Sequence, residues 1–293
     1  MSVSTETAAA RFAGLDEWDS TELVSGILEG QFAAIAAVHA AGADLAHAID
    51  RAAERLAGGG RLIYLGAGTS GRIAAQDAAE LPPTFGWPPE RAVTLMAGGQ
   101  DVLFQAAEGA EDDEDLAIAE LTALSVGADD VVIAVAASGR TPYAVAGLSH
   151  AREAGALTIG LFNNRGSTLG AVAEIPILLE TGAEVIAGST RMKAGTSQKA
   201  ALNCLSTGIM VRLGFVYRGL MVGMAPSNLK LQDRATKMIA SLTDASPETA
   251  RSALNAAGGN IKVATVMIMR SLDAPAAAER LSKANGNLRR ALE

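Results

Sequence analysis

The fold is decided by residues 61–72, which read RLIYLGAGTSGR. Leu62–Leu65 is a short apolar run, and a glycine-rich turn with two hydroxyl side chains, Thr69 and Ser70, comes directly after it. The next residues, Gly71–Glu80, have the composition of a helix. An apolar strand, a glycine turn and a helix in succession predict the first β–α unit of a parallel sheet.

Four more apolar runs repeat this pattern along the middle of the chain. They are short, rich in Val, Ile and Leu, and mostly lack polar–apolar alternation, which is typical of strands buried on both faces of a parallel sheet. Helical stretches lie between most of them. We therefore predict an α/β fold with a doubly wound parallel sheet and flanking helices. The expected strands are Arg61–Gly66, Ala92–Ala97, Asp130–Ala136, Leu157–Phe162 and Ile175–Leu179, and the helices include Gly71–Glu80, Asp113–Leu124 and Tyr143–Ala154.

Helical segments are expected on both sides of this region. Thr21–Leu56 spaces its apolar residues helically and breaks near Gly42, which predicts two helices. A long, largely apolar helix is predicted at Gly188–Gly214. Three short helices are predicted near the C-terminus, starting at Ser246-Pro247, Asn260 and Asp273. The predicted parts are N-terminal helices at 1–57, a central domain at 58–225 and a small helical appendage at 226–293.

Composition and charge argue against several classes of protein. Of 293 residues, 49% are hydrophobic, which is enough for a large core and argues against disorder. The formal charge is −8, from 24 basic and 32 acidic residues, whereas a nucleic-acid-binding protein needs a basic surface. The single cysteine, Cys204, and three scattered histidines argue against a disulfide framework and against a Cys/His zinc site.

No membrane segment is expected from the charge pattern. The longest stretch without a charged residue, Gly30–Ala43, is too short to span a bilayer as a helix. The first residues show no basic patch followed by an apolar region, so no signal peptide is visible. We therefore expect a cytoplasmic protein that binds neither membranes nor nucleic acid.

Two loops of similar design follow the first and third predicted strands. Gly66, Gly68 and Gly71 fit the spacing of the dinucleotide fingerprint, but the acid which that fingerprint expects is missing at the end of the second strand. What remains is backbone N–H groups and hydroxyls at a helix N-terminus, which suits an anion. Residues 137–142, ASGRTP, repeat this design. Both loops are expected at the carboxyl edge of one sheet and predict a site for a phosphorylated small molecule, with a merely structural turn as the alternative.

A third segment, residues 181–196, is dense in hydrogen-bond donors before and within the long helix. Arg191 and Lys193 supply cations for a carboxylate or a phosphate. A solvated helix start is the structural alternative.

Two acidic features are candidates for acid–base chemistry. Glu80 is expected at a helix end before a rigid Pro-Pro turn, where the helix dipole disfavours a carboxylate. Apolar Leu81 and Phe85 nearby would raise the pKa of Glu80 toward that of a general acid. Residues 108–115 hold six acids in eight positions, a pattern typical of a solvated helix start, although one member facing inward would serve as a base.

Several of these segments are recognisable family motifs. They are GAGTSGR at 66–72, ELPPTFG at 80–86, EGAED at 108–112, AASGRTPY at 136–143, GSTRMKAGT at 188–196, LSTGIMVRLG at 205–214 and GGNIK at 258–262. Together, over nearly the whole chain, they resemble the N-acetylmuramic acid 6-phosphate etherase family, which has the sugar isomerase (SIS) fold. The chain departs from the family pattern at 77–81, DAAEL for the usual Asp-Ala-Ser-Glu-Cys, and at 162–167, FNNRGS for a Cys-Asn-Pro turn.

The resemblance implies an activity and a site. The family cleaves the D-lactyl ether of N-acetylmuramic acid 6-phosphate by elimination and then water addition, giving N-acetylglucosamine 6-phosphate and D-lactate. It works as a homodimer and needs no metal, so no cofactor is expected. The family's two essential carboxylates map to Glu80 and Glu111, and we interpret them as the acid for the leaving oxygen and the base for the C2 proton. The expected substrate-binding residues are Gly68, Thr69, Ser70, Ser138, Gly139, Arg140, Thr141, Glu184, Ser189, Thr190, Arg191 and Lys193.

The hydroxyls of Thr69, Ser70, Ser138 and Thr141 are expected to hold the 6-phosphate, and Arg191 or Lys193 the lactyl carboxylate. Two alternatives have the same fold. A phosphosugar isomerase would move a proton between C1 and C2 and needs no acid for a leaving group at C3. A non-catalytic sugar-phosphate sensor need not keep both carboxylates.

Overall fold

The computed structural model describes residues 4–99, 103 and 109–293. The chain forms two compact units. The first consists of Met1–Ala78 with Glu90–Gly208, and the second of Ala79–Pro89 with Ile209–Glu293. The division into parts at 1–57, 58–225 and 226–293 stays a prediction.

A parallel sheet forms the centre of the first unit. In the described part of the chain it has five strands in the order β2-β1-β3-β4-β5, and every neighbouring pair is parallel. The α/β prediction is therefore confirmed, and each predicted strand exists with bounds shifted by at most one residue. The strands are β1 (Leu62–Gly66), β2 (Ala92–Met96), β3 (Val131–Ala136), β4 (Leu157–Phe162) and β5 (Ile175–Leu178).

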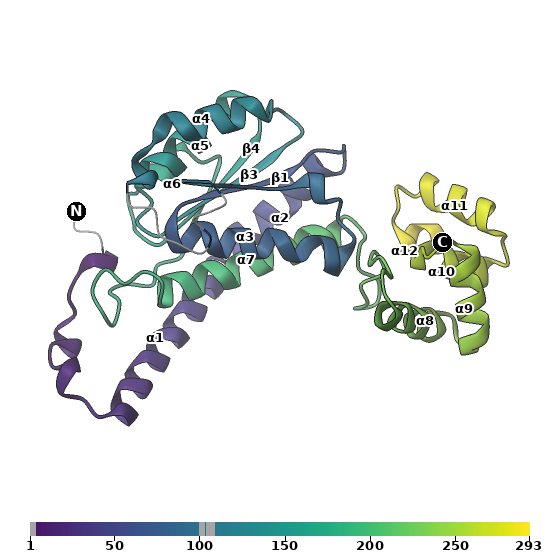
Figure 1. Ribbon diagram of the computed structural model, residues 1–293, viewed down its shortest axis with the longest axis horizontal. Coiled ribbons are helices and arrows are strands. Elements are labelled where there is room, and N and C mark those ends of the chain that lie inside the picture. The colour runs from purple at the N-terminus through teal and green to yellow at the C-terminus, as the bar shows by residue number, and fades with distance from the viewer. Residues whose placement is uncertain (1–3, 100–102, 104–108) are drawn as a thin grey trace. The chain divides into compact units, whose positions relative to one another are not determined.

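Helices cover both faces of this sheet, as expected for a doubly wound fold (Figure 1). Helices α4, α5 and α6 lie on one face, and α2, α3 and α7 on the other. All residues of β1, β3 and β4 are buried, which explains their unbroken apolar sequences. The bounds are α2 (Gly42–Leu56), α3 (Gly68–Phe85), α4 (Glu114–Ala123), α5 (Pro142–Glu153), α6 (Thr168–Val172) and α7 (Lys193–Arg212).

Before α2 the chain forms short 3-10 turns and one long helix, α1 (Ser20–Ala40). Asp19 caps α1 through a capping box with Glu22, and the break at Ala41 separates it from α2, so the two predicted N-terminal helices are confirmed. Among the described helices, α1 alone is long and apolar enough to cross a membrane by length and composition, although it carries two acids. Core helices and signal sequences pass the same test, so the test by itself does not make α1 a membrane span.

The prediction of a Pro-Pro turn after Glu80 is wrong. Helix α3 continues through Pro82 and Pro83 to Phe85. Two prolines remove only two N–H donors from the last turns, and the Gly86 N–H still closes the helix on the Pro82 carbonyl at 2.9 Å. The helix ends at Gly86, where φ is +66° and a side chain would be strained.

The second unit contains more helices than the sequence predicted. The three expected helices are confirmed as α9 (Pro247–Ala256), α10 (Ile261–Arg270) and α11 (Ala274–Lys283). Two further helices, α8 (Leu229–Thr243) and α12 (Leu288–Leu292), are present within the fully described residues 226–293. Asn228 and Asn287 cap them through their side chains, a signal that the sequence offered but that the prediction missed.

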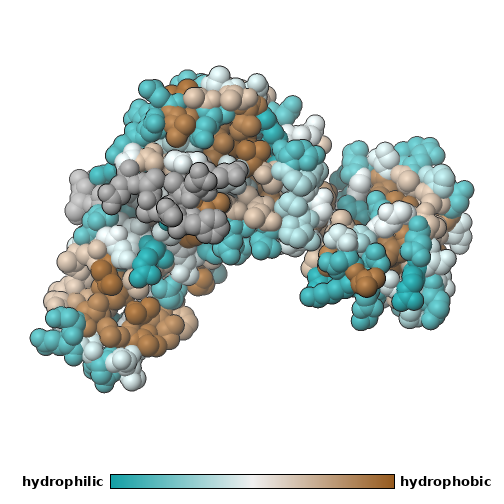
Figure 2. Space-filling view, in the orientation of Figure 1, coloured by the Kyte–Doolittle hydropathy of each residue, from teal (hydrophilic) through white to brown (hydrophobic). Residues whose placement is uncertain are grey.

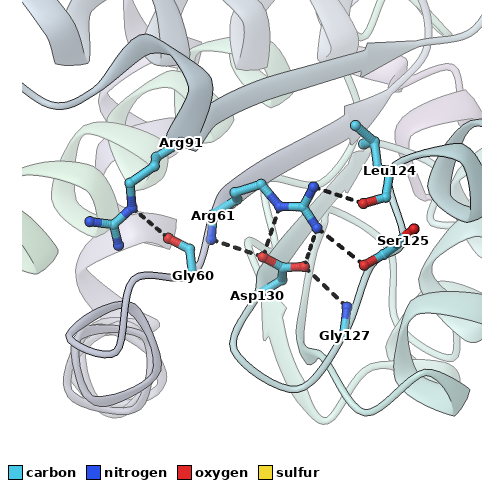
Figure 3. Close-up of polar contacts among 7 residues, drawn as sticks. All are labelled: Gly60, Arg61, Arg91, Leu124, Ser125, Gly127 and Asp130. Atoms are coloured by element: carbon cyan, nitrogen blue, oxygen red, sulfur yellow. Dashed lines mark hydrogen bonds and ion pairs between the residues drawn. The ribbon is translucent and has the colours of Figure 1, made fainter.

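An ion pair joins the amino ends of β1 and β3, at the edge of the sheet opposite the glycine turns (Figure 3). The guanidinium and the backbone N–H of Arg61 donate to the carboxylate of Asp130, whose side chain is 6% exposed. The N–H of Gly127 donates to the same carboxylate at 3.0 Å. Arg61 also donates to the carbonyls of Leu124 and Ser125, so this cluster fixes the entrances to both strands.

Candidate functional site

The loop after β1 is a tight turn that needs glycine. A Cβ on Gly66 would lie 3.0 Å from the backbone of Gly71, and one on Gly71 would lie 2.9 Å from the Gly66 carbonyl oxygen. Gly68, at φ +53°, opens α3. Thr69 and Ser70 follow in its first turn, so their backbone N–H groups are at the positive end of the helix dipole. This arrangement suits an anion, and the binding of an anion here stays a prediction.

The loop after β3 has the same design. Gly139 has φ +64°, and a Cβ there would lie 2.4 Å from the Cβ of Ser167. The Ser138 hydroxyl accepts from the Arg140 N–H at 3.1 Å, while the Arg140 side chain is exposed. Thr141 precedes α5 at the cap position, but its hydroxyl does not cap this fully described helix. Because β1 and β3 pair with Gly66 opposite Val135, the two loops are neighbours at the carboxyl edge.

The segment before α7 is organised by Glu184. Helix α7 begins at Lys193, not at the predicted Gly188. The buried carboxylate of Glu184 accepts from the backbone N–H of Lys193 at 3.2 Å and of Ala194 at 2.9 Å, and so caps the helix. The late start follows because Glu184 satisfies these first N–H groups. Burial raises the pKa of Glu184 and lowers the pKa of the Lys193 ammonium, which attract one another.

This segment meets the loop after β1. A Cβ on Gly195 would lie 3.3 Å from the Thr190 carbonyl oxygen and 3.6 Å from the Cγ2 of Thr69. Ser189 and Thr190 are half-buried, whereas Arg191 is exposed. The first unit therefore brings the start of α7 to the glycine turn, as the phosphosugar prediction requires.

Behind the turn lies a buried polar relay that the sequence analysis missed. The Ser70 hydroxyl donates to Gln198 Oε1 at 3.0 Å, and Gln198 Nε2 donates to Asn163 Oδ1 at 3.1 Å. Asn163 follows β4 directly, and its Nδ2 donates to the Leu179 carbonyl after β5 at 2.8 Å. Two consecutive asparagines at the end of a buried strand were the available signal, since parallel strands bring their carboxyl ends together.

Asp77 forms a second buried cluster between α3 and α7. Its carboxylate accepts from the Tyr64 hydroxyl at 2.9 Å and from Asn203 Nδ2 at 3.0 Å. Lys199 Nζ lies 3.8 Å from it, and Ser206 adds a further hydrogen bond. Burial raises the pKa of Asp77, although these partners favour the charged form. The cluster joins two helices that carry predicted site residues.

The two predicted catalytic carboxylates are both exposed. Glu80 lies on α3 and is exposed, so the expected enclosure of its carboxylate by Leu81 and Phe85, which are themselves buried, is not seen. Glu111 lies in a 3-10 turn at Ala110–Asp112, just before Asp113 caps α4. Of the acidic run, Glu108 is outside the described residues and 111–115 are all exposed. Glu80 belongs to the second unit and Glu111 to the first, so their meeting in one pocket stays a prediction.

Comparison with known families identifies the fold. The glucokinase regulatory protein N-terminal SIS domain matches residues 44–152, and the SIS domain matches residues 111–207. A solved protein of Escherichia coli CFT073 has a TM-score of 0.50 at 18% identity and covers 69% of this chain and 97% of its own.

Curated relatives match over nearly the whole chain. N-acetylmuramic acid 6-phosphate etherases are 49% identical in Deinococcus radiodurans, covering 98% of this chain and 94% of the relative, and 45% identical in Mycolicibacterium smegmatis, covering 99% and 97%. Another, from Streptomyces coelicolor, is 45% identical and covers 99% and 93%. The resemblance read from the motifs is thus confirmed: the chain belongs to the N-acetylmuramic acid 6-phosphate etherase family and has its SIS fold.

Proposed function

We propose that this protein is a carbon–oxygen lyase that cleaves the lactyl ether of N-acetylmuramic acid 6-phosphate, giving N-acetylglucosamine 6-phosphate and D-lactate. The observation that carries the proposal is the 49% identity to the Deinococcus radiodurans etherase over 98% of the chain. The paired glycine turns at one sheet edge support it, because they suit the phosphate of such a substrate. We also propose a cytoplasmic location, which the similarity to the etherases of Deinococcus radiodurans and Streptomyces coelicolor supports.

The phosphate is proposed to bind at the two turns and so to anchor the sugar far from the reacting carbons. At the start of α3, Gly68 and the residues after it offer backbone N–H groups. In the loop before α5 the N–H of Gly139 already donates to the Ala136 carbonyl and that of Arg140 to the Ser138 hydroxyl, so the hydroxyls of Ser138 and Thr141 are the groups proposed to act there. Binding energy from this remote group positions C2 and C3 for reaction. In the same scheme Thr190 and Ser189 contact the sugar, and Lys193 or Arg191 contacts the lactyl carboxylate.

The reaction needs one base and one acid. In the open-chain sugar the C1 aldehyde acidifies the C2 proton, and Glu111 removes it. The electron pair of the C2–H bond passes into the C1 carbonyl to give an enolate, and this step is reversible. The pair then forms the C2=C3 bond as the C3–O bond breaks and its electrons leave with the lactate oxygen, which Glu80 protonates. Water then adds its oxygen at C3 and a proton at C2. The overall change is the addition of water across the ether bond, so no redox partner is needed.

The proposal is tested with purified protein and N-acetylmuramic acid 6-phosphate. D-lactate should be released in an amount equal to the N-acetylglucosamine 6-phosphate formed. Fructose 6-phosphate serves as the control substrate and should remain unchanged, because the proposed acid–base pair acts on a leaving group at C3. Isomerisation of fructose 6-phosphate without lactate release would assign the chain to the isomerases instead.

Heavy water tests the elimination route separately. Addition of water to the C2=C3 bond takes the C2 proton from solvent, so the sugar product should carry one deuterium at C2. Mass spectrometry measures the gain, and NMR locates it. A product with full lactate release but ordinary hydrogen at C2 would contradict elimination.

We also propose that the protein works as a homodimer, in which α1 contributes to the interface. Four large apolar side chains of α1 are exposed at helical spacing, and the most exposed, Phe32, is 77% exposed. Figure 2 shows apolar residues gathered over this N-terminal part of the first unit. A stripe of this kind on a two-fold axis packs against its own copy. Its members are Val24, Leu28, Phe32 and Ile35.

Phe32→Ser tests this assembly. Burial of one phenylalanine side chain contributes roughly 1.5–3 kcal/mol, so the dimer dissociation constant should rise about tenfold or more. Sedimentation velocity over a concentration series measures it. Ile118→Ser on α4, where a lone apolar side chain is 36% exposed, is the matched control and should leave the dimer intact. A monomeric parent protein, or an equal shift in both variants, would contradict the proposal.

A further inference from the structure

The hydrogen bonds that join Ser70, Gln198 and Asn163 can run in only one direction from donor to acceptor. The neighbours of Asn163 fix this direction. The Asn163 Nδ2 group lies 2.8 Å from the Leu179 carbonyl oxygen and 2.9 Å from Ser197 Oγ. A backbone carbonyl can only accept, and the Ser197 hydroxyl already donates to the Ala194 carbonyl at 2.7 Å. Both neighbours therefore require the NH2 side of the Asn163 amide, and its oxygen must face the other way.

This direction passes to Ser70 through Gln198. Because Asn163 presents its oxygen, Gln198 must donate to it through Nε2, at 3.1 Å. The Gln198 oxygen then faces Ser70 Oγ at 3.0 Å. An amide oxygen only accepts, so Ser70 must donate its single hydroxyl hydrogen to Gln198. The opposite orientation of the amides would set the Asn163 oxygen against the Leu179 carbonyl oxygen, two acceptors with no hydrogen between them.

The burial of all three side chains preserves the donor and acceptor roles along this chain of hydrogen bonds. Ser70 is 8% exposed, Gln198 1% and Asn163 0%. Water therefore has little access to replace a broken bond, and an unsatisfied buried amide costs roughly 1–3 kcal/mol. Ser70 lies in the first turn of α3, Asn163 at the end of β4 and Gln198 near the start of α7, so one chain of hydrogen bonds links three elements of the first unit.

The consequence concerns what Ser70 can offer to a ligand. A hydroxyl has one hydrogen to donate and two lone pairs that accept. With the hydrogen given to Gln198, only lone pairs are left. A phosphate dianion presents only acceptors, so donation to it would break the bond to Gln198 and leave a buried amide oxygen without a donor. A sugar hydroxyl presents a hydrogen and fits.

We propose that Asn163 and Gln198 are positioning residues that hold Ser70 as a hydrogen-bond acceptor for a hydroxyl group of the bound sugar. The inference rests on the proposed function, since it takes a sugar phosphate as the ligand. It differs from the sequence-based prediction, in which the Ser70 hydroxyl helps to hold the phosphate. The phosphate is left to the backbone N–H groups and to the loop that contains Ser138 and Thr141.

Calorimetric titration with two probes tests the acceptor role without turnover. The probes are N-acetylglucosamine 6-phosphate and inorganic phosphate. Ser70→Ala should weaken the sugar phosphate about five- to tenfold, the scale of one neutral hydrogen bond, and change inorganic phosphate less than twofold. Equal weakening of both probes would overturn this inference alone. A parent protein that binds inorganic phosphate but not the sugar phosphate would overturn the proposed function and the acceptor role with it.

A double-mutant cycle tests whether Gln198 acts through Ser70. Gln198→Met should weaken the sugar phosphate by a similar factor, and the double variant should bind no more weakly than Ser70→Ala alone. Ser206→Ala, another buried polar change on α7, is the control for a purely structural loss and should keep affinity within twofold. Thermal unfolding is followed for each variant. Independent, multiplying effects of the two changes would overturn the positioning role.

Discussion

Replacing Glu80 by Gln will lower kcat for lactate release by roughly 100-fold or more, the usual scale for a general acid or base. The amide keeps the size of the side chain but cannot give a proton to the departing alkoxide. Substrate binding should change little, because the substitution leaves the two turns proposed to bind the phosphate and the start of α7 untouched. The measurement is the initial rate of D-lactate formation. Glu90→Gln, the same change at another exposed glutamate, should keep a normal rate.

Glu111→Gln should reduce lactate release by a comparable factor, and proton exchange distinguishes the two roles. If Glu111 is the base at C2, its loss also stops deuterium exchange into unreacted substrate in heavy water. Glu80→Gln should keep that exchange while lactate release fails, because the C2 proton is still removed. Asp112→Asn, beside Glu111 and also exposed, is the control and should keep a normal rate. Exchange that persists in Glu111→Gln would refute the base assignment, and a near-normal rate in either variant would refute its role.

The sheet could be predicted because its strands carry their own burial signal. Val131–Ala136 is apolar at each position and buried at each position, as a strand covered on both faces must be. The glycine turn after β1 could also be predicted from neighbouring residues, because the backbone at Gly66 and Gly71 approaches too closely to admit a side chain. Both properties reside in a few consecutive residues, so no knowledge of the rest of the fold was needed.

Other features depend on partners that are distant in sequence. Ser70 is recognisable as a hydroxyl at a helix start, but its hydrogen-bond direction is set by Gln198, 128 residues later, and by Asn163. The role of Glu184 among the substrate-binding residues stays a prediction, but the structure shows a second role that the sequence did not reveal, because its oxygens cap α7 nine and ten residues on. The pairing of Glu80 with Glu111 came from the family resemblance. Spacing alone cannot supply such contacts.

Asp130→Asn should lower the free energy of unfolding by about 3 kcal/mol and leave kcat within twofold. Removing one partner of a buried ion pair costs roughly 3–5 kcal/mol, and the lower end applies because the Arg61 side chain keeps 26% exposure. The amide also turns an N–H toward the donors of Arg61 or Gly127 (Figure 3). Activity is spared because the pair lies at the amino edge of the sheet. Urea unfolding measures the change.

The same pair predicts how the stability difference depends on pH. Burial alone would raise the pKa of Asp130, but hydrogen bonds from Arg61 and Gly127 and the charge of Arg61 outweigh it and hold the pKa below its usual value. The stabilisation is therefore complete above the unfolded-state pKa of about 3.9 and is lost as the pH falls through the folded-state value. The difference in the free energy of unfolding between the parent protein and Asp130→Asn should become smaller as the pH falls through that range. Asp129→Asn, an exposed neighbour, should stay within about 0.5 kcal/mol of the parent protein at every pH. If the difference in the free energy of unfolding stays constant down to pH 3, the lost stability comes from packing and not from the charge of Asp130.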